Sequence, residues 1–193
     1  MYKLITAATS EPCVAADLKS QLRITSSSQD TYLGTLLKAA RIWAEDYLRF
    51  QLVSATWELY LDEFPDSGKC IYIQKSPVTA ISSFTYIDSD GDTQTLTEGT
   101  DFVADYNSMP CRIYEAYDKT WPTPRDIRNC ITIRFAAGYA TALAVPEIIK
   151  QAILIKAATM YENPTEEVSG TQVSQFDAVT AQKLLAPYRA IRF

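Results

Sequence analysis

The sequence predicts an α+β protein: a helical bundle built from both chain ends, with a β-strand-rich insertion between them. Two periodicities predict this class. Before residue 50 and after residue 145, apolar residues recur at three- and four-residue steps, as in amphipathic helices. Between residues 53 and 136 the apolar period is two, as in strands. With 193 residues, 47% of them hydrophobic, the chain can bury a substantial core.

Helices are expected at residues 14–23, 30–49, 146–162 and 178–186. The second shows the clearest pattern, because one face of it carries a continuous apolar stripe: Leu33, Leu36, Leu37, Ala40, Trp43, Ala44 and Tyr47. Pro146 and Glu147 suit the first turn of the third helix, and Pro164 limits its end. Since one or two amphipathic helices cannot bury their apolar faces alone, helices from both ends should pack on each other.

Short strands are expected within SATWELYLDEF, KCIYIQK, AISSFTYID, DFVADY, CRIYEAY and CITIRFAAG. The first alternates strictly, with Trp57, Leu59 and Leu61 on one face. The predicted organisation is therefore residues 1–52 as the first half of the helical core, 53–140 as the β insertion, 141–177 as the second half with a linker, and 178–193 as a C-terminal helix and tail.

Motifs for catalysis or ligand binding are missing from the sequence. It contains no histidine, no GxxxxGKS/T and no GxGxxG, so triads and nucleotide loops have no support. The aspartates of DSDGDT do not fit a calcium loop, because Thr93 and Gly99 occupy its sixth and twelfth positions; Asp90-Gly91 indicates a hairpin turn. The four cysteines are widely spaced and are expected to be free thiols. We expect no enzyme activity, no cofactor and no metal.

The net charge of −5 disfavours a protein that grips DNA phosphates, because such binding needs clustered lysine and arginine. Apolar runs are interrupted well before the roughly 20 residues needed to cross a bilayer. The N-terminal residues carry one lysine and a short apolar patch, which does not suit a secretory signal. A cytosolic protein is therefore expected.

A series of segments, taken in order, resembles a known family. The segments are EPCVAADLKSQLRI, LLKAARIWAEDYLRF, ATWELYLDEFP, SPVTAISSFTYIDSDGDTQTL, CRIYEAYDKTWP, ITIRFAAGYA, VPEIIKQAILIKAATMYENP and LLAPYR. Together they resemble the head-tail connector, or adaptor, proteins of tailed bacteriophages, over nearly the whole chain. Cys13-Val14 departs from the helix-capping Thr usual in such sequences, and residues 163–177 are the least similar.

The resemblance implies a structural protein of the virion neck in a tailed phage or phage-like particle, assembled in the bacterial host cytoplasm. It implies a ring, expected to be a dodecamer like the portal, that binds the portal protein and a stopper or other neck or tail component. DNA would pass through the ring without specific binding, and no membrane is involved. The isolated chain is expected to be monomeric or weakly associating. The alternatives are another neck or tail-completion protein, such as a stopper or tail terminator, and more remotely a small enzyme.

The C-terminal sequence KLLAPYRAIRF places large apolar groups at a chain end, where a polar terminus is usual. We expect it to be the main portal-binding element, through Leu184, Leu185, Tyr188, Arg189, Ile191, Arg192 and Phe193. Pro187 ends the helix, and the arginines could form forked hydrogen bonds with acidic portal groups. The alternative is that these side chains fold back onto the subunit's own core.

Overall fold

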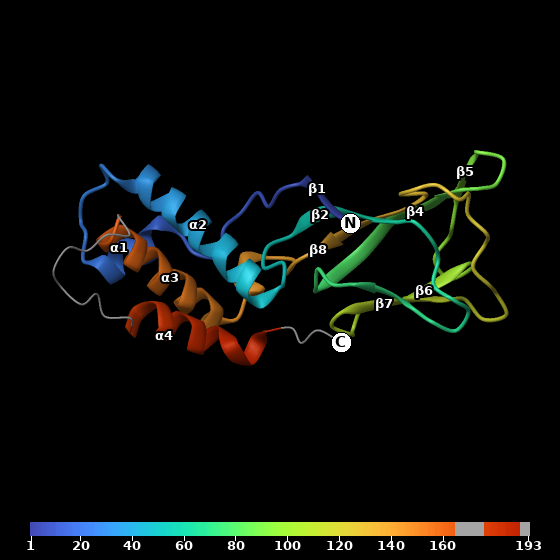
Figure 1. Cartoon of the computed structure of the whole chain (residues 1–193). Helices are drawn as coiled ribbons and strands as arrows, with labels where there is room; N and C mark the ends of the chain where they lie inside the picture. The colour runs from blue at the N-terminus through green and yellow to red at the C-terminus, as the bar shows by residue number, and fades with distance from the viewer. Residues whose placement is uncertain (165–175, 190–193) are drawn as a thin grey trace. The chain divides into compact units, whose positions relative to one another are not determined.

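The computed structural model describes residues 1–164 and 176–189 (Figure 1). The chain divides into two compact units. The sheet unit comprises Met1–Thr9 and Ser54–Ala140, and the helical unit comprises Ser10–Val53 and Thr141–Phe193. The predicted mixed α+β class is confirmed in this general form.

The described part of the helical unit contains α1 (Ala15–Leu22), α2 (Asp30–Leu48), α3 (Glu147–Glu162) and α4 (Phe176–Leu185), with short 3₁₀ turns at Ala142–Ala144 and Ala186–Tyr188. Each helix lies within two residues of its predicted bounds. Helix α3 packs against α1, α2 and α4. Its buried side chains include Ile149, Ile153 and Ala157, at the helical spacing that the sequence shows.

Helix α2 buries the apolar stripe read from the sequence. Leu33, Leu37 and Leu48 are fully or almost fully buried, and the smaller Ala40 and Ala44 lie between them. Trp43 and Tyr47 lie at the margin of this stripe and remain half-exposed. The helix ends at Arg49, which adopts a left-handed conformation with φ of 60°.

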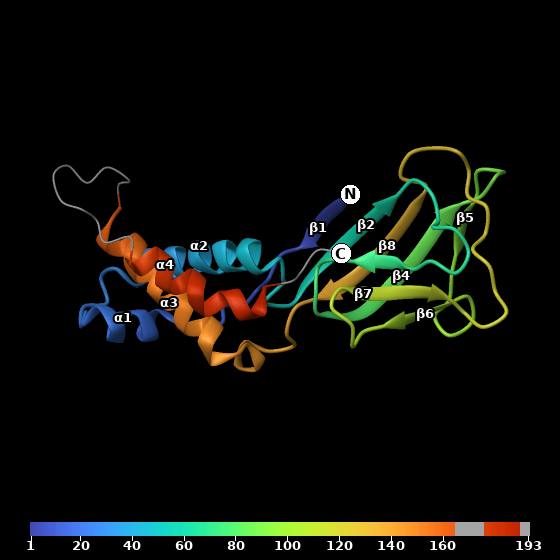
Figure 2. The same cartoon turned by 60° about the horizontal axis from the view of Figure 1, so that its bottom comes forward.

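The sheet unit contains two antiparallel sheets (Figure 2). The larger has the order β1-β2-β8-β4-β5, and the smaller has the order β3-β7-β6. The strand bounds are β1 Tyr2–Thr6, β2 Ala55–Leu61, β3 Ile71–Ile73, β4 Val78–Ile87, β5 Thr93–Thr95, β6 Phe102–Asp105, β7 Cys111–Glu115 and β8 Ile131–Ala137. All six predicted strands are present.

Strand β1 was not predicted and changes the assignment of the chain's first residues. The sequence predicts residues 1–52 as the first half of the helical core, but Tyr2–Thr6 pairs with β2 and belongs to the sheet unit. The N–H of Tyr60 donates to the carbonyl of Met1 at 2.8 Å and begins this pairing. Four of the five residues of β1 are exposed, so the strand has no buried–exposed alternation that a period-two pattern in the sequence could reflect.

The facing sides of the two sheets form the core of the sheet unit. Its fully buried side chains include Phe84, Phe102 and Phe135, and the rings of Phe84 and Phe102 lie 5.0 Å apart. Around them the core holds Leu59, Ile71, Ile73, Val78, Cys111, Ile113, Cys130, Ile131, Ile133 and Ala137. Strand β2 contributes Leu59 to this core, as its alternation predicts, and Trp57 and Leu61 pack at the edge of it.

The opposite face of β2 is less open than simple alternation predicts, because Glu58 is only 6% exposed. Its carboxylate accepts hydrogen bonds from the Tyr60 hydroxyl and from Arg134, whose Nε lies 2.8 Å from Oε1. Arg134 stands opposite Glu58 on β8. These partners cover the carboxylate and satisfy it.

The segment DSDGD forms the predicted hairpin turn between β4 and β5. The Asp88 carboxylate accepts hydrogen bonds from the backbone N–H groups of Asp90, Gly91 and Asp92, at 2.9 to 3.0 Å. Gly91 has φ of 97°, a conformation that favours glycine. The aspartates therefore have a structural role in the turn.

Candidate docking site

The predicted docking residues begin at the end of α4, and those that the structure describes fall into three groups by exposure. Leu185 is completely buried within the helical unit. Leu184 and Tyr188 are half-buried, and Arg189 is exposed. Ile191, Arg192 and Phe193 lie outside the described residues. Leu185 thus anchors α4 in its own subunit, whereas Leu184, Tyr188 and Arg189 remain accessible to different degrees.

Pro187 explains the change of backbone at this point. It lies in the 3₁₀ turn Ala186–Tyr188, where its missing N–H and fixed φ prevent α4 from continuing. The backbone of Arg189 is extended, with φ of −68° and ψ of 127°. Helix α4 therefore ends before Pro187, as the sequence predicts, and the last described residue has extended backbone angles.

A row of two aromatic rings and two cations lies on the helical unit. The Cζ atom of Arg189 lies over the ring of Tyr47, 5.3 Å from its centroid. Tyr47 stacks on Trp43, with centroids 6.0 Å apart and planes at 18°. The Nζ atom of Lys156, on α3, lies 5.2 Å from the centroid of Trp43. The sequence places both rings on the apolar stripe and gives no sign of their cationic partners.

A buried polar network fixes the segment that leaves α2. The guanidinium of Arg41 donates to Glu11 at 2.6 Å and to Glu45 at 2.7 Å, and Arg41 is only 5% exposed. Glu45 also accepts hydrogen bonds from the Gln51 amide at 2.8 Å and from the Leu52 N–H at 2.9 Å. Burial disfavours the charged guanidinium, but the hydrogen bond with Glu11 and the charge of Glu45 raise the pKa of Arg41 overall.

The titratable groups of the described residues do not form a recognisable catalytic or metal site. Burial raises the pKa of both Cys13 and Cys111 to about 12, so these thiols are poor nucleophiles at neutral pH. Residues 1–164 and 176–189 contain no group of three or more cysteine, aspartate or glutamate side chains that could hold a metal ion. Within the same residues, no helix is long and apolar enough to cross a membrane.

A comparison with protein families tests the resemblance to head-tail connectors. The model of the phage gp6-like head-tail connector protein family matches residues 16–107. The predicted resemblance to head-tail connectors is confirmed. The matched segment begins in α1 and extends past β6, so it includes parts of both units. A search of curated proteins finds no match to this chain.

Solved structures of a gene transfer agent (GTA) contain chains with the same fold. A chain in the virion of the native GTA particle is 21% identical, with a TM-score of 0.78 over 100% of this chain and 97% of that chain. A chain in the neck of the empty particle, computed with C6 symmetry, is 23% identical with a TM-score of 0.77 and the same coverage. A chain in the neck of the native particle, computed with C12 symmetry, is 22% identical with a TM-score of 0.70 and the same coverage.

Proposed function

We propose that this connector-like chain is a structural head-tail connector (adaptor) in the neck of a tailed phage or phage-like particle. The match of residues 16–107 to the connector family carries this proposal. Fold similarity over the full chain to chains of GTA particles, two of them in neck structures, supports it. The protein would be assembled in the bacterial cytoplasm and become part of the virion.

In this proposal the subunits form a ring beneath the portal protein. A closed ring of identical chains needs two different contact faces on each subunit. The C12 symmetry used for one of the similar neck structures favours a dodecamer. We propose that helices from both chain ends form one bundle that carries the ring and the portal contact, a view supported by the packing of α3 against α1, α2 and α4. The β insertion would face the stopper or another neck or tail component.

The distribution of charge supports passage of DNA without specific binding. The sheet unit holds 13 acidic side chains and 8 basic ones, whereas the helical unit holds 10 of each. The net charge of −5 therefore comes from the sheet unit, because the charges of the helical unit cancel. We propose that acidic groups of this unit border the DNA channel, because carboxylates repel phosphates and let the duplex slide.

The C-terminal segment remains our proposed portal-binding element. Leu185 would hold the segment on its own subunit, while Leu184, Tyr188 and Arg189, with Ile191, Arg192 and Phe193, would contact the portal. An extended backbone at Arg189 and the position of the segment at the end of an anchored helix support this role. Truncation after Ala186 should abolish co-sedimentation with portal rings, while the thermal melt stays nearly unchanged.

Other functions have less support. Stoppers and tail terminators tend to consist mainly of strands, whereas half of this chain is a helical unit. An enzyme would need a catalytic grouping, and the buried thiols with raised pKa do not provide one. We therefore propose a protein without catalytic activity.

Electron microscopy of the purified chain mixed with purified portal rings tests the proposal. The expected result is a second ring stacked on one end of the portal, and light scattering should show the chain alone to be monomeric or weakly associating. Rings that stack only on tail tubes would favour a tail terminator. A complete lack of portal binding would overturn the adaptor proposal.

A further inference from the structure

We infer that Arg189, held over the ring of Tyr47, is a preorganised receptor for a carboxylate of the portal protein, and that Tyr47 is its positioning residue. This inference rests on the proposed function. It adds residues of α2 to a site for which the sequence indicated only the C-terminal segment. The Cζ atom of Arg189 lies 5.3 Å from the centroid of the Tyr47 ring, within the range of a cation–π contact.

The Tyr47 ring is held in place by its neighbours. Trp43 lies one helical turn earlier on α2, so the two rings project from the same face of the helix. They stack with centroids 6.0 Å apart and planes at 18°. Lys156 approaches the other ring of the pair, at 5.2 Å from the Trp43 centroid. A ring stacked in this way offers Arg189 a surface with restricted motion.

Arg189 keeps its hydrogen-bonding capacity in this position. Among residues 1–164 and 176–189, its side chain has no recorded hydrogen bond or ion pair, and the residue is exposed. A guanidinium over an aromatic face still presents its N–H donors at its edge, in a fork that matches a carboxylate. Because the ring already restricts the side chain, less rotamer entropy is lost when the partner binds.

A portal carboxylate fits this receptor better than a DNA phosphate does. Strong phosphate binding by proteins comes from many clustered basic groups. The helical unit has equal numbers of acidic and basic residues, 10 of each, and so has no excess of positive charge. Arg189, with Lys156 as the second cation of the row, suits a single directed ion pair with a protein partner better than a run of phosphates.

Nuclear magnetic resonance of the free full-length chain tests the positioning without portal. The Arg189 Nε–Hε signal, assigned by its loss in Arg189→Lys, should show a ring-current shift that persists in Tyr47→Phe and disappears in Tyr47→Leu. Tyr32→Leu is the matched control, because Tyr32 lies on the same helix and contacts Tyr161 instead of Arg189. An unshifted signal in the wild type, or a shift retained in Tyr47→Leu, would overturn the inference.

Binding of single subunits to portal rings at low occupancy tests the consequence. Tyr47→Leu should weaken binding roughly two- to five-fold, as expected for loss of one exposed cation–π contact. Arg189→Lys should weaken it roughly tenfold, because the ammonium lacks the fork. Tyr47→Phe and Tyr32→Leu should bind as the wild type does, and all variants should remain folded, with at most a small decrease in melting temperature for Tyr47→Leu and Tyr32→Leu.

The outcomes separate this inference from the proposed function. If truncation after Ala186 abolishes binding but Tyr47→Leu binds as the wild type does, the positioning role fails while the portal-binding segment stands. If the truncated chain still binds portal, the proposed role of the segment fails, whatever the spectra show. If the wild-type protein binds a duplex DNA probe and Arg189→Lys loses this binding, Arg189 binds phosphate and the inference is wrong.

Discussion

The helical unit and the sheet unit each contain an arginine–glutamate pair, but the two pairs lie in different surroundings. In the helical unit the Arg41 side chain is 6% exposed and bonds to both Glu11 and Glu45. In the sheet unit the Arg134 side chain is 48% exposed and covers the Glu58 side chain, which is 8% exposed. The first pair is a buried junction between three chain segments, whereas the second shields one carboxylate. Their energetic weights should differ accordingly.

The largest expected effect follows from removing the buried guanidinium. Arg41→Leu leaves Glu11 and Glu45 close together without a counter-charge, and breaking a buried pair in this way costs about 3–5 kcal/mol. Urea unfolding monitored by circular dichroism measures the loss. Arg41→Lys should lose less, because it keeps the charge but not the three hydrogen bonds that the guanidinium makes. A loss below about 1 kcal/mol for Arg41→Leu would mean that the network is incidental.

The second prediction applies the same change to the sheet unit. Arg134→Leu should cost only about 1 kcal/mol, because Arg134 is half-exposed and water can replace it, while Tyr60 still donates to Glu58. The same urea measurement applies. Equal losses in Arg41→Leu and Arg134→Leu would contradict the proposed difference between the two pairs.

The contrast between these pairs also shows what the sequence could reveal. The spacing of Arg41 and Glu45 predicts only a modest surface pair, since they are four positions apart on one helix. Their burial depends on Glu11 and Gln51, which lie in other segments and approach α2 only in the folded chain. Such long-range partners leave no periodic signal, whereas the apolar stripe of the 19-residue helix α2 was predictable because its period repeats over several turns.

The candidate docking site shows the same limit. The sequence indicated the C-terminal segment by its unusual apolar content, and the break at Pro187 was predictable from proline chemistry. It did not indicate that Leu185 is buried in its own subunit or that Arg189 lies over Tyr47. Tyr47 and Arg189 are far apart in the sequence, so only the fold brings them together.

The third prediction concerns acid and the carboxylate in the sheet unit. The hydrogen bond from Tyr60, more than that from Arg134, lowers the pKa of Glu58 from its ordinary value of 4.5, although burial opposes the shift. A lowered folded-state pKa gives stability that is fully present above pH 4.5 and is lost as the pH falls through the folded value. In Tyr60→Phe this acid-dependent loss should be smaller, and stability at pH 7 should fall by about 1 kcal/mol.

Urea unfolding of the wild type and Tyr60→Phe at pH 7 and pH 3 measures this difference. Tyr161→Phe is a suitable control, because its hydroxyl donates to Gln29, an uncharged partner in the helical unit. An identical change between the two pH values in the wild type and Tyr60→Phe would show that Glu58 does not contribute to the acid dependence.

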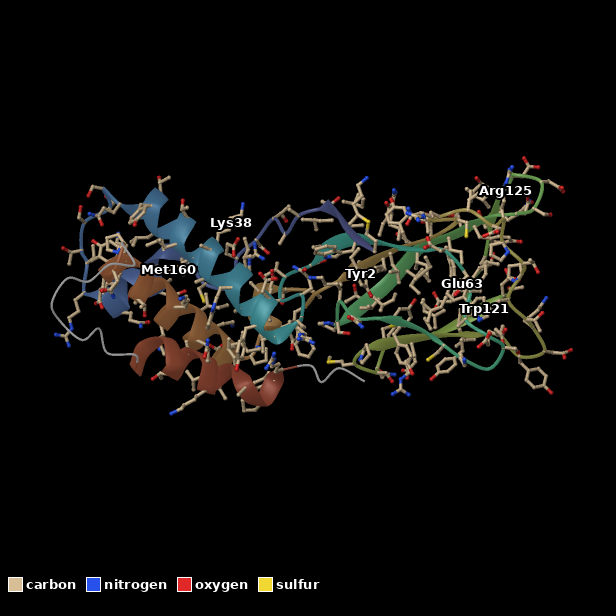
Figure 3. All side chains as sticks on the ribbon, viewed as in Figure 1. Tyr2, Lys38, Glu63, Trp121, Arg125 and Met160 are labelled. Atoms are coloured by element: carbon tan, nitrogen blue, oxygen red, sulfur yellow. The ribbon has the colours of Figure 1, made fainter. Side chains whose placement is uncertain are left out.

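The smallest predicted effects compare one cation–π contact in each unit. Lys156 lies 5.2 Å from the Trp43 centroid in the helical unit, and Lys75 lies 4.6 Å from the Trp57 centroid in the sheet unit. Replacing either lysine by methionine keeps the aliphatic stem but removes the charge. Each change should therefore cost about 0.5–1 kcal/mol, with the larger loss for the closer pair. Lys38→Met is the control, because Lys38 points away from α2 into solvent (Figure 3).

Urea unfolding measures the loss of stability, and the Arg189 Nε–Hε signal gives a second readout. Lys156→Met should shift this signal slightly, since Trp43 supports Tyr47, whereas Lys75→Met should leave it unchanged. If Lys75→Met moved the Arg189 signal as much as Lys156→Met did, the row on the helical unit would not be the local device inferred from its contacts.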